Sequence, residues 1–155
     1  MYSIDVENNR ALIQCNFRDS NSKFVRFSAL YDTGAQISVF TAVSIDPDLS
    51  EDDFKESRTT NLKGLINDDD LSIVGYSCKI PDFYFGNIHI SYVDALITFD
   101  ERVTDNLVGM DVISRITRLG IANTDKILFF KDYQELSEYV NSHDEGELSS
   151  AYVDV

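Results

Sequence analysis

The chain has 155 residues, which suits a single domain, and 43% of them are hydrophobic, so it can bury a core. Lys and Arg total 13 against 27 Asp and Glu, and the resulting formal net charge of −14 argues against binding to nucleic acid or to an anionic membrane. No signal peptide and no membrane-spanning apolar run is visible, so we expect a cytoplasmic protein.

Strand-like patterns dominate the chain before residue 131. Residues 10–17 and 24–31 are rich in β-forming side chains, and the turn-like segment RDSNSK between them predicts a hairpin. Further strands are expected, in chain order, at residues 71–80, 88–99 and 126–130, with breaks at Pro81–Asp82 and Gly86–Asn87. The pattern predicts an all-β domain, a closed β-barrel-like fold with one or two short helices.

Two helices are expected, one on each side of the last of these strands. Just after Gly109, one helical face would carry Val112, Ile116 and Leu119. In the acidic C-terminal part, helical spacing recurs at Tyr133, Leu136 and Val140. We therefore divide the chain into a domain at 1–131 and an acidic C-terminal helix and tail at 132–155.

The C-terminal part is the most acidic region of the chain. From Asp132 onward it contains seven Asp and Glu residues and no Lys or Arg. Beyond Asn141 the periodicity is lost, which favours a solvated tail. Such a tail is either a frayed terminus or an acidic recognition segment.

No metal site is expected. The acidic clusters at residues 46–53 and 68–70 lack the ligand spacing of an EF-hand and are interpreted as solvated loops. His89 and His143 have no partner at ligand spacing. The two cysteines, 15 and 78, lack the CxxC spacing of a zinc site and are interpreted as core thiols.

The segment ALYDTGAQISVF, residues 29–40, carries the clearest chemical signal. A hydrophobic strand leads directly into Asp32-Thr33-Gly34, and a second apolar run follows. In such a tight turn the Asp32 carboxylate projects, the Thr33 hydroxyl can bond across the turn, and Gly34 lets another backbone approach closely. A second segment, NLVGMDVI at 106–113, is a short apolar strand followed by Gly109 and Asp111.

Together the two segments resemble those of the retropepsin-like aspartic proteases, the single-domain family of retroviral and retrotransposon proteases and their cellular relatives. The signatures of that family are hydrophobic-hydrophobic-Asp-Thr-Gly-Ala and, later in the chain, hydrophobic-hydrophobic-Gly-x-Asp/Asn before a helix. The resemblance covers residues 10–131. It implies an acid protease fold that is active as a dimer.

The resemblance also implies roles for individual residues. Asp32 would be the catalytic acid, and Thr33, Gly34 and Ala35 would support the active-site turn, with Thr33 linking two such turns and the Gly34 carbonyl meeting substrate. Gly109 and Asp111 would support the active-site loop rather than perform chemistry.

A flap, a β-hairpin that closes over the peptide, is implied between the two motifs. Its candidate is the segment 61–70, with Gly64, Leu65 and Ile66 near the tip. Retroviral members often have an acid where Gln36 stands and an Arg where Met110 stands, and those two side chains pair. Both charges are absent here, which is typical of a cellular or bacterial branch.

Aspartic proteolysis needs two carboxylates that share a proton, and they titrate as a pair. This chain has one Asp-Thr-Gly, so the second carboxylate must come from Asp32 of another copy in a C2 homodimer. The expected partners are a second copy and a polypeptide substrate, with no nucleic acid or membrane, and neither a metal nor an organic cofactor is required.

Three interpretations follow from the sequence. The first is an aspartic endopeptidase that hydrolyses extended polypeptides. The second is a catalytically silent dimeric module of the same fold that binds peptides or serves as a scaffold. The third is an unrelated acidic β-protein in which Asp32 merely begins a turn.

Overall fold

The computed structural model describes residues 1–8, 10–65, 72–121, 125–142 and 151–154, and these are mostly in strands. The strands are, in chain order, β1 (Tyr2–Glu7), β2 (Arg10–Arg18), β3 (Phe24–Tyr31), β4 (Val39–Thr41), β5 (Thr59–Leu62), β6 (Ile73–Phe85), β7 (Ile88–Thr98), β8 (Leu107–Val108), β9 (Thr117–Ile121), β10 (Lys126–Phe130) and β11 (Ala151–Asp154). The helices are α1 (Ala42–Ile45), the 3-10 helix η1 (Glu51–Phe54), α2 (Met110–Ile113) and α3 (Tyr133–Asn141). Within the described ranges, no helix is long and apolar enough to cross a membrane.

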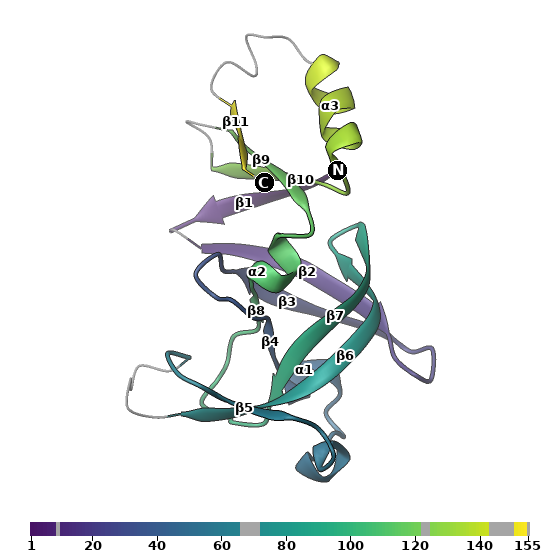
Figure 1. The fold of residues 1–155 in the computed structure, drawn as a ribbon, viewed down its shortest axis with the longest axis vertical. Helices are drawn as coiled ribbons and strands as arrows, with labels where there is room; N and C mark the ends of the chain where they lie inside the picture. Colours follow the sequence, from purple (N-terminus) through teal and green to yellow (C-terminus); the bar gives the residue numbers. More distant parts are fainter. Residues whose placement is uncertain (9, 66–71, 122–124, 143–150, 155) are drawn as a thin grey trace.

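The sheet has a barrel-like body and a four-stranded extension (Figure 1). The strands pair in the order β11-β9-β10-β1-β2-β3-β8-β4-β7-β6-β5, and an additional pairing between β2 and β6 brings the sheet back on itself. That pairing makes a ring from β2 to β6, which confirms the mainly β, barrel-like prediction. The extension consists of β11, β9, β10 and β1, and lies above the body together with α3 in Figure 1.

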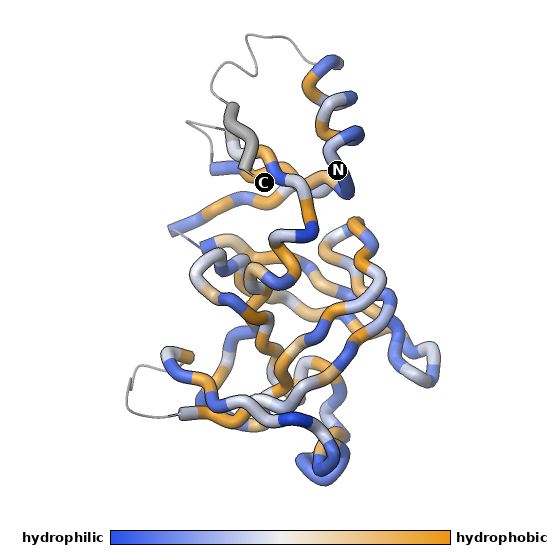
Figure 2. The backbone as a smooth tube through the Cα atoms, in the orientation of Figure 1, coloured by the Kyte–Doolittle hydropathy of each residue, from blue (hydrophilic) through white to orange (hydrophobic). Residues whose placement is uncertain are grey.

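The predicted hairpin at 10–17 and 24–31 is confirmed as β2 and β3, paired antiparallel from Leu12↔Leu30 to Arg18↔Phe24. Buried and exposed residues alternate along β2, as expected for a strand with one face on the core. In Figure 2 the turn between these two strands is hydrophilic. The expected strands at 88–99 and 126–130 are confirmed as β7 and β10.

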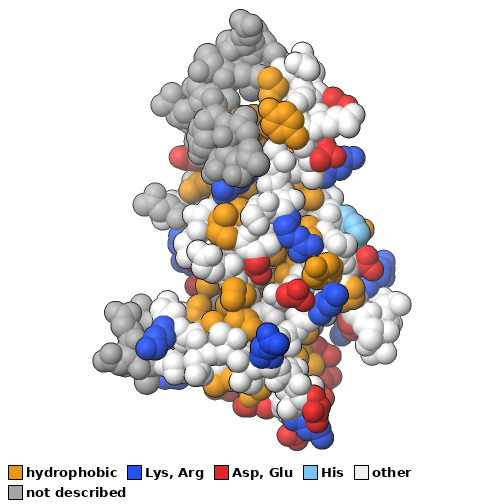
Figure 3. All heavy atoms as spheres, in the orientation of Figure 1, with side chains coloured by type: hydrophobic (Ala, Val, Ile, Leu, Met, Phe, Trp, Pro, Cys, Tyr) orange, Lys and Arg blue, Asp and Glu red, His pale blue; other side chains and the backbone are white. Residues whose placement is uncertain are grey.

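The acidic cluster between Asp46 and Asp53 lies at the surface, as predicted. In Figure 3, acidic side chains gather at the lower end of the molecule, where Figure 1 shows η1. Asp53 has a local role, because its Oδ2 accepts the backbone N–H of Ser50 at 2.9 Å and caps η1. Within the described residues, no group of three or more His, Cys, Asp or Glu could hold a metal ion; residues 68–70 lie outside them.

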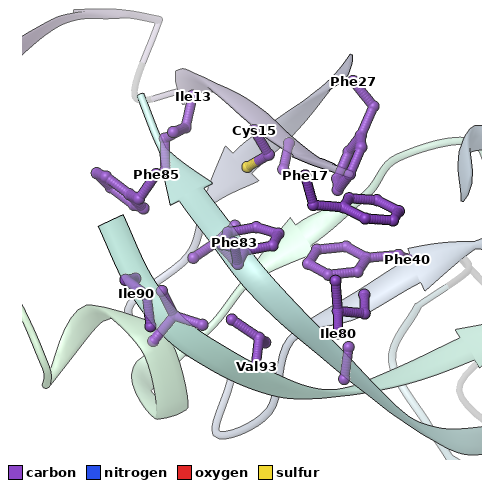
Figure 4. Packing of buried hydrophobic residues seen from close by; sticks show 14 of the residues in the cluster. Ile13, Cys15, Phe17, Phe27, Phe40, Ile80, Phe83, Phe85, Ile90 and Val93 are labelled. Carbon is purple, nitrogen blue, oxygen red and sulfur yellow. The ribbon is translucent and has the colours of Figure 1, made fainter. Parts of the chain in front are cut away.

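Aromatic side chains fill the body (Figure 4). Phe40 stacks on Phe83 with ring centroids 5.9 Å apart, and Phe27 meets Phe40 edge-on at 4.9 Å. Cys15 is fully buried in this core, and burial raises the pKa of its thiol far above the ordinary value. Cys15 is thus the predicted core thiol, whereas Cys78 is half-buried and packs against the core.

Helix α3 covers the extension. Its Leu136 is buried in a small second cluster together with Leu119, Leu128 and Phe130. The predicted helix is confirmed, but its contact face is not the expected one. Tyr133 is 63% exposed and Val140 38% exposed, and Tyr139 packs beside Leu136 instead.

The expected break at Pro81–Asp82 is wrong. Strand β6 runs through this position, and its register with β7 is the same on both sides, at Ile80↔Val93 and Phe83↔Ile90. Around Pro81, β6 pairs with β7 alone among the described strands, and a strand edge of this kind tolerates a proline that cannot donate a hydrogen bond. The expected turn at Gly86–Asn87 is confirmed.

The expected helix through Val112, Ile116 and Leu119 is too long. Helix α2 ends at Ile113, and the chain enters β9 at Thr117. All three residues are buried, but Leu119 is buried from a strand, paired with Leu128 of β10. Because β-branched residues are poor helix formers and β10 offers a partner, the strand prevails over the helical spacing.

The expected solvated tail beyond Asn141 is partly a strand. Residues 151–154 form β11, which pairs antiparallel with β9, for example at Tyr152↔Gly120. Residues 143–150, which connect α3 to β11 in the sequence, lie outside the described residues. Strand β1 was also not expected, because its alternation is short and its partners, β2 and β10, lie at opposite ends of the chain.

Candidate active site

Asp32 follows the last residue of β3 and is held by backbone hydrogen bonds. Its N–H donates to the Val108 carbonyl oxygen at 3.0 Å, which ties the turn to β8. Its Oδ1 accepts the Gly34 N–H at 2.9 Å, so the carboxylate is oriented by its own turn. A Cβ atom at Gly34 would lie 3.3 Å from that Oδ1, so a side chain there would crowd the carboxylate.

The second motif is hydrogen-bonded directly to this turn. The Met110 N–H donates to the Ala35 carbonyl oxygen at 2.8 Å, and the Asp111 N–H donates to that of Gln36 at 3.2 Å. A Cβ atom at Gly109 would lie 2.8 Å from the Ala35 oxygen, a distance that real Cβ atoms do not reach. The tertiary structure thus joins two segments that the sequence separates, and the joint is made by backbone hydrogen bonds.

Ser38 connects the same two segments through a buried hydroxyl. Its Oγ donates to Asp111 Oδ1 at 2.7 Å and accepts the Gly109 N–H at 3.0 Å, while its own carbonyl oxygen accepts the Leu96 N–H at 3.0 Å. Its side chain is fully buried. Asp111 thereby acts as an acceptor inside the support, although its Oδ2 is buried without a hydrogen-bond partner in the described structure.

Asn106 forms a second buried link. Its Oδ1 accepts the Thr41 N–H at 2.8 Å, and its Nδ2 donates to the Ser28 carbonyl oxygen and to Ser44 Oγ, each at 3.0 Å. The side chain therefore joins β3, β4 and α1 just before β8. Sequence reasoning did not identify Ser38 or Asn106 as buried links. Asn106 is the first residue of the second motif, but the sequence carried no signal that its side-chain amide is buried.

A row of leucines lies next to the turn. Leu12 of β2 is opposite Leu30 of β3, which is opposite Leu107 of β8. Leu12 is 58% exposed between buried neighbours, so this row is on the outer face of the sheet. Asp32 stands two residues after Leu30, in the turn that follows β3. The turn that carries the carboxylate therefore adjoins the Leu30 end of this row.

The flap candidate falls on the hairpin of β5 and β6, which pair from Thr59↔Tyr76 to Leu62↔Ile73. Gly64 and Leu65 lie in its connecting loop, and Gly64 has a left-handed φ of 82°. Ile66 lies outside the described residues. In Figure 1 this hairpin and the loop after β3 extend toward the same side of the molecule.

An aromatic cluster supports the base of this hairpin. Phe54 of η1, Tyr76 of β6 and Phe99 contact one another with centroids 5.7 to 5.9 Å apart. The Tyr76 hydroxyl donates to a Glu51 carboxylate oxygen at 2.6 Å, and this hydrogen bond raises the pKa of Tyr76. Helix η1 therefore packs against the base of the hairpin.

Comparison with known proteins identifies a structural relative but no sequence relative. No protein-family model matches the chain, and no curated protein matches it. The chain is similar to the crystal structure of a retropepsin-like aspartic protease from Rickettsia conorii, with a TM-score of 0.56 and 16% identity, over 83% of this chain and 88% of that one. The chain has a retropepsin-like fold.

Within this retropepsin-like fold, the residues predicted from the two motifs lie together. The Ala35 carbonyl oxygen accepts the Met110 N–H, and the Asp32 N–H donates to Val108, the residue before Gly109. Gly34 donates to Asp32 Oδ1. Thr33 is exposed in the turn. Of the flap candidates, Gly64 and Leu65 lie on the separate β5–β6 hairpin.

Proposed function

We propose that the chain is an aspartic endopeptidase in which the Asp32 carboxylates of two copies activate a water molecule. The observation that supports this most is the pair of backbone hydrogen bonds between the segment that follows Asp32 and the Gly109–Asp111 segment. It holds one carboxylate in a defined orientation, and the buried side chains of Ser38 and Asn106 link the segments on either side of the turn. The likeness of the fold to a retropepsin-like aspartic protease supports the same reaction class.

The chemistry requires that the two carboxylates share one proton. Like charges about 3 Å apart cannot both ionise, so one member remains protonated at working pH. The ionised member takes a proton from water, and the protonated member donates to the scissile carbonyl oxygen. The exposed turn at Thr33 and Gly34 leaves the approach to Asp32 open to a second copy.

The substrate is an extended polypeptide with an apolar residue beside the scissile bond. The Leu12, Leu30 and Leu107 row supplies apolar surface next to Asp32, where burying such a side chain is favourable. The loop of the β5–β6 hairpin, with Gly64 and Leu65, is the segment that would close over the peptide.

The test is digestion of an unfolded protein mixture between pH 4 and 7.5, with products identified by mass spectrometry. Wild type is compared with Asp32→Asn, which keeps the shape of the side chain and removes its ionisable group. The matched control is Asp94→Asn, which removes an exposed carboxylate from β7.

Cleavage by wild type and by the Asp94 variant, but not by the Asp32 variant, is the expected result. Cut sites should then carry apolar residues beside the scissile bond. Equal cleavage by all three proteins would remove Asp32 from the reaction. No cleavage by any of them, with a dimer in solution, would favour the catalytically silent peptide-binding or scaffolding module.

A further inference from the structure

A groove of about 570 Å³ lies where β1 separates from β2. Its lining consists of Tyr2, Ser3, Ile4, Asp5, Glu7, Asn8, Arg10, Leu12 and Asp105. The two strands pair only at Val6↔Ala11 and Glu7↔Arg10, next to their connecting turn. From that turn they diverge, as Figure 1 shows, because β1 goes on to pair with β10. We call this space the β1–β2 groove.

One wall of the β1–β2 groove is an open strand edge. Over Tyr2–Asp5, β1 pairs with β10 on one side, and no described strand pairs with the other side. The Val6 N–H donates to the Asp125 carbonyl oxygen at 2.6 Å, toward β10. Because successive N–H groups along a strand alternate in direction, those of Ser3 and Asp5 point into the groove.

The opposite wall is the facing edge of β2. The Leu30 N–H donates to the Asn106 carbonyl oxygen, away from β2, so Leu12 and Leu30 are not hydrogen-bonded to each other and the Leu12 backbone groups face the groove. Two residues further along β2, the Gln14 N–H donates a hydrogen bond to the Tyr2 hydroxyl oxygen at 3.0 Å, and this contact closes the end of the groove. An extended segment between the two walls would find donors and acceptors on both sides.

The charges around the groove favour a basic occupant. Asp5, Glu7 and Asp105 contribute three carboxylates, against the single guanidinium of Arg10. Arg10 is already paired with Asp105, Nη2 to Oδ2 at 3.3 Å. Asp5 and Glu7 are exposed on the same side of β1, opposite Lys126 of β10 and Arg10 of β2. The three carboxylates still exceed these two cations by one negative charge, which a Lys or Arg side chain of an inserted strand would meet.

We propose that the β1–β2 groove binds an extended polypeptide segment that bears Lys or Arg, held by strand pairing with β1. This is the β-strand addition mode of recognition, in which the backbone supplies affinity and alternate side chains supply specificity. The site is separate from the Asp32 turn, but Leu12 belongs both to the groove and to the leucine row. In the proposed endopeptidase, a substrate would therefore be held at a second place next to the scissile bond.

The test uses the full chain carrying Asp32→Asn, so a bound peptide cannot be cleaved and the result does not depend on whether the chain is a protease. The probe is a fluorescein-labelled peptide, Thr-Lys-Val-Lys-Val-Lys-Thr, with a matched peptide in which glutamate replaces each lysine. Binding is measured by fluorescence anisotropy, and the amide signals of Ser3, Asp5 and Leu12 are followed by NMR. Ser3→Pro removes one N–H from the open edge, and Ser3→Ala is its control.

We expect the lysine peptide to bind about tenfold more tightly than the glutamate peptide, with shifts at those three amides. Ser3→Pro should weaken binding about tenfold and Ser3→Ala should leave it unchanged. If Ser3→Pro lowers the melting temperature, the double variant Asp5→Asn/Glu7→Gln replaces it, and it should abolish the preference for lysine.

Equal affinity for the two peptides would overturn the proposal, as would binding that both the proline and the double variant leave unchanged. Failure of the lysine peptide to bind would also overturn it. If the lysine peptide does not bind and Ser3→Pro reduces self-association of the chain, measured by sedimentation, the groove accommodates a second copy of the chain instead.

Discussion

Gly109 lies so close to Ala35 that a Cβ atom on Gly109 would be 2.8 Å from the Ala35 carbonyl oxygen and 2.9 Å from the carbonyl carbon and oxygen of Ile37. The hydrogen bond from the Met110 N–H to the same Ala35 oxygen depends on this approach. A glycine is therefore required sterically, not for an unusual backbone angle, since its φ of −100° is open to any residue.

Gly109→Ala should push the second motif away from the Asp32 turn. We expect a loss of about 1–3 kcal/mol in the free energy of unfolding, measured in urea, and loss of cleavage activity. Gly34→Ala is the comparison, because its Cβ atom would meet only Asp32 Oδ1, at 3.3 Å. It should reduce activity with a smaller loss of stability. Wild-type stability in Gly109→Ala would contradict the close approach.

Ser38→Ala should leave the Gly109 N–H and Asp111 Oδ1 without their shared hydroxyl partner. Because these groups are buried around Ser38, the expected cost is about 1–3 kcal/mol in the free energy of unfolding. Ser28→Ala, which removes only the exposed hydroxyl bonded to Gln14, should change it by no more than about 0.5 kcal/mol. Similar values for the two variants would show that the Ser38 link contributes little.

Mixing wild type with Asp32→Asn tests whether two copies form one site. If chains pair at random, adding an equal amount of the variant should lower the total activity by about half, because mixed dimers lack one carboxylate. Addition of Asp94→Asn should instead increase the total activity. Activity that does not change on adding Asp32→Asn would mean that each chain acts alone.

Gly64→Ala tests the flap assignment. The added methyl group would meet no atom within 4 Å, but φ is 82°, so the substitution costs about 1 kcal/mol through backbone strain alone. If the loop closes over the peptide, kcat/KM should fall several-fold while the melting temperature changes little. Lys63→Ala, its neighbour, is the control. An unchanged kcat/KM in Gly64→Ala would place the flap elsewhere.

The pair Asp100–Arg102 predicts a pH dependence of stability. The Arg102 guanidinium donates to both Asp100 carboxylate oxygens, at 2.9 and 2.6 Å, and these bonds lower the pKa of Asp100 to about 2. Because the folded-state pKa is below the unfolded one, the pair stabilises the fold above about pH 4, and this contribution is lost between pH 4 and 2.

Asp100→Asn should therefore lower the melting temperature at pH 6 and have less effect at pH 2.5. Glu101→Gln, at the neighbouring exposed position, controls for the loss of one negative charge. An equal effect of Asp100→Asn at both pH values would show that the ion pair is not formed in solution.

Local patterns predicted the elements whose partners are close in sequence. The β2–β3 hairpin followed from two alternating runs around a turn, because adjacent segments need only a short loop to pair. Helix α3 followed from the spacing of its apolar residues. Predictions were wrong where the pairing of a strand decided the outcome, because residue spacing and a single proline do not show which strand edges are paired. Leu119 lies in a strand because β10 pairs with it, and Pro81 is accommodated because β6 has an edge there.

The sequence by itself determined the all-β class and the turn at Asp32-Thr33-Gly34, since the first depends on side-chain alternation and the second on a short motif. Only the tertiary structure decided that Ala35 and Gly109 touch, that Ser38 and Asn106 are buried links, and that β1 leaves an open edge beside β2. The physical reason is that hydrogen bonds and steric limits act between atoms that the chain brings together only on folding, and one linear sequence does not record those distances.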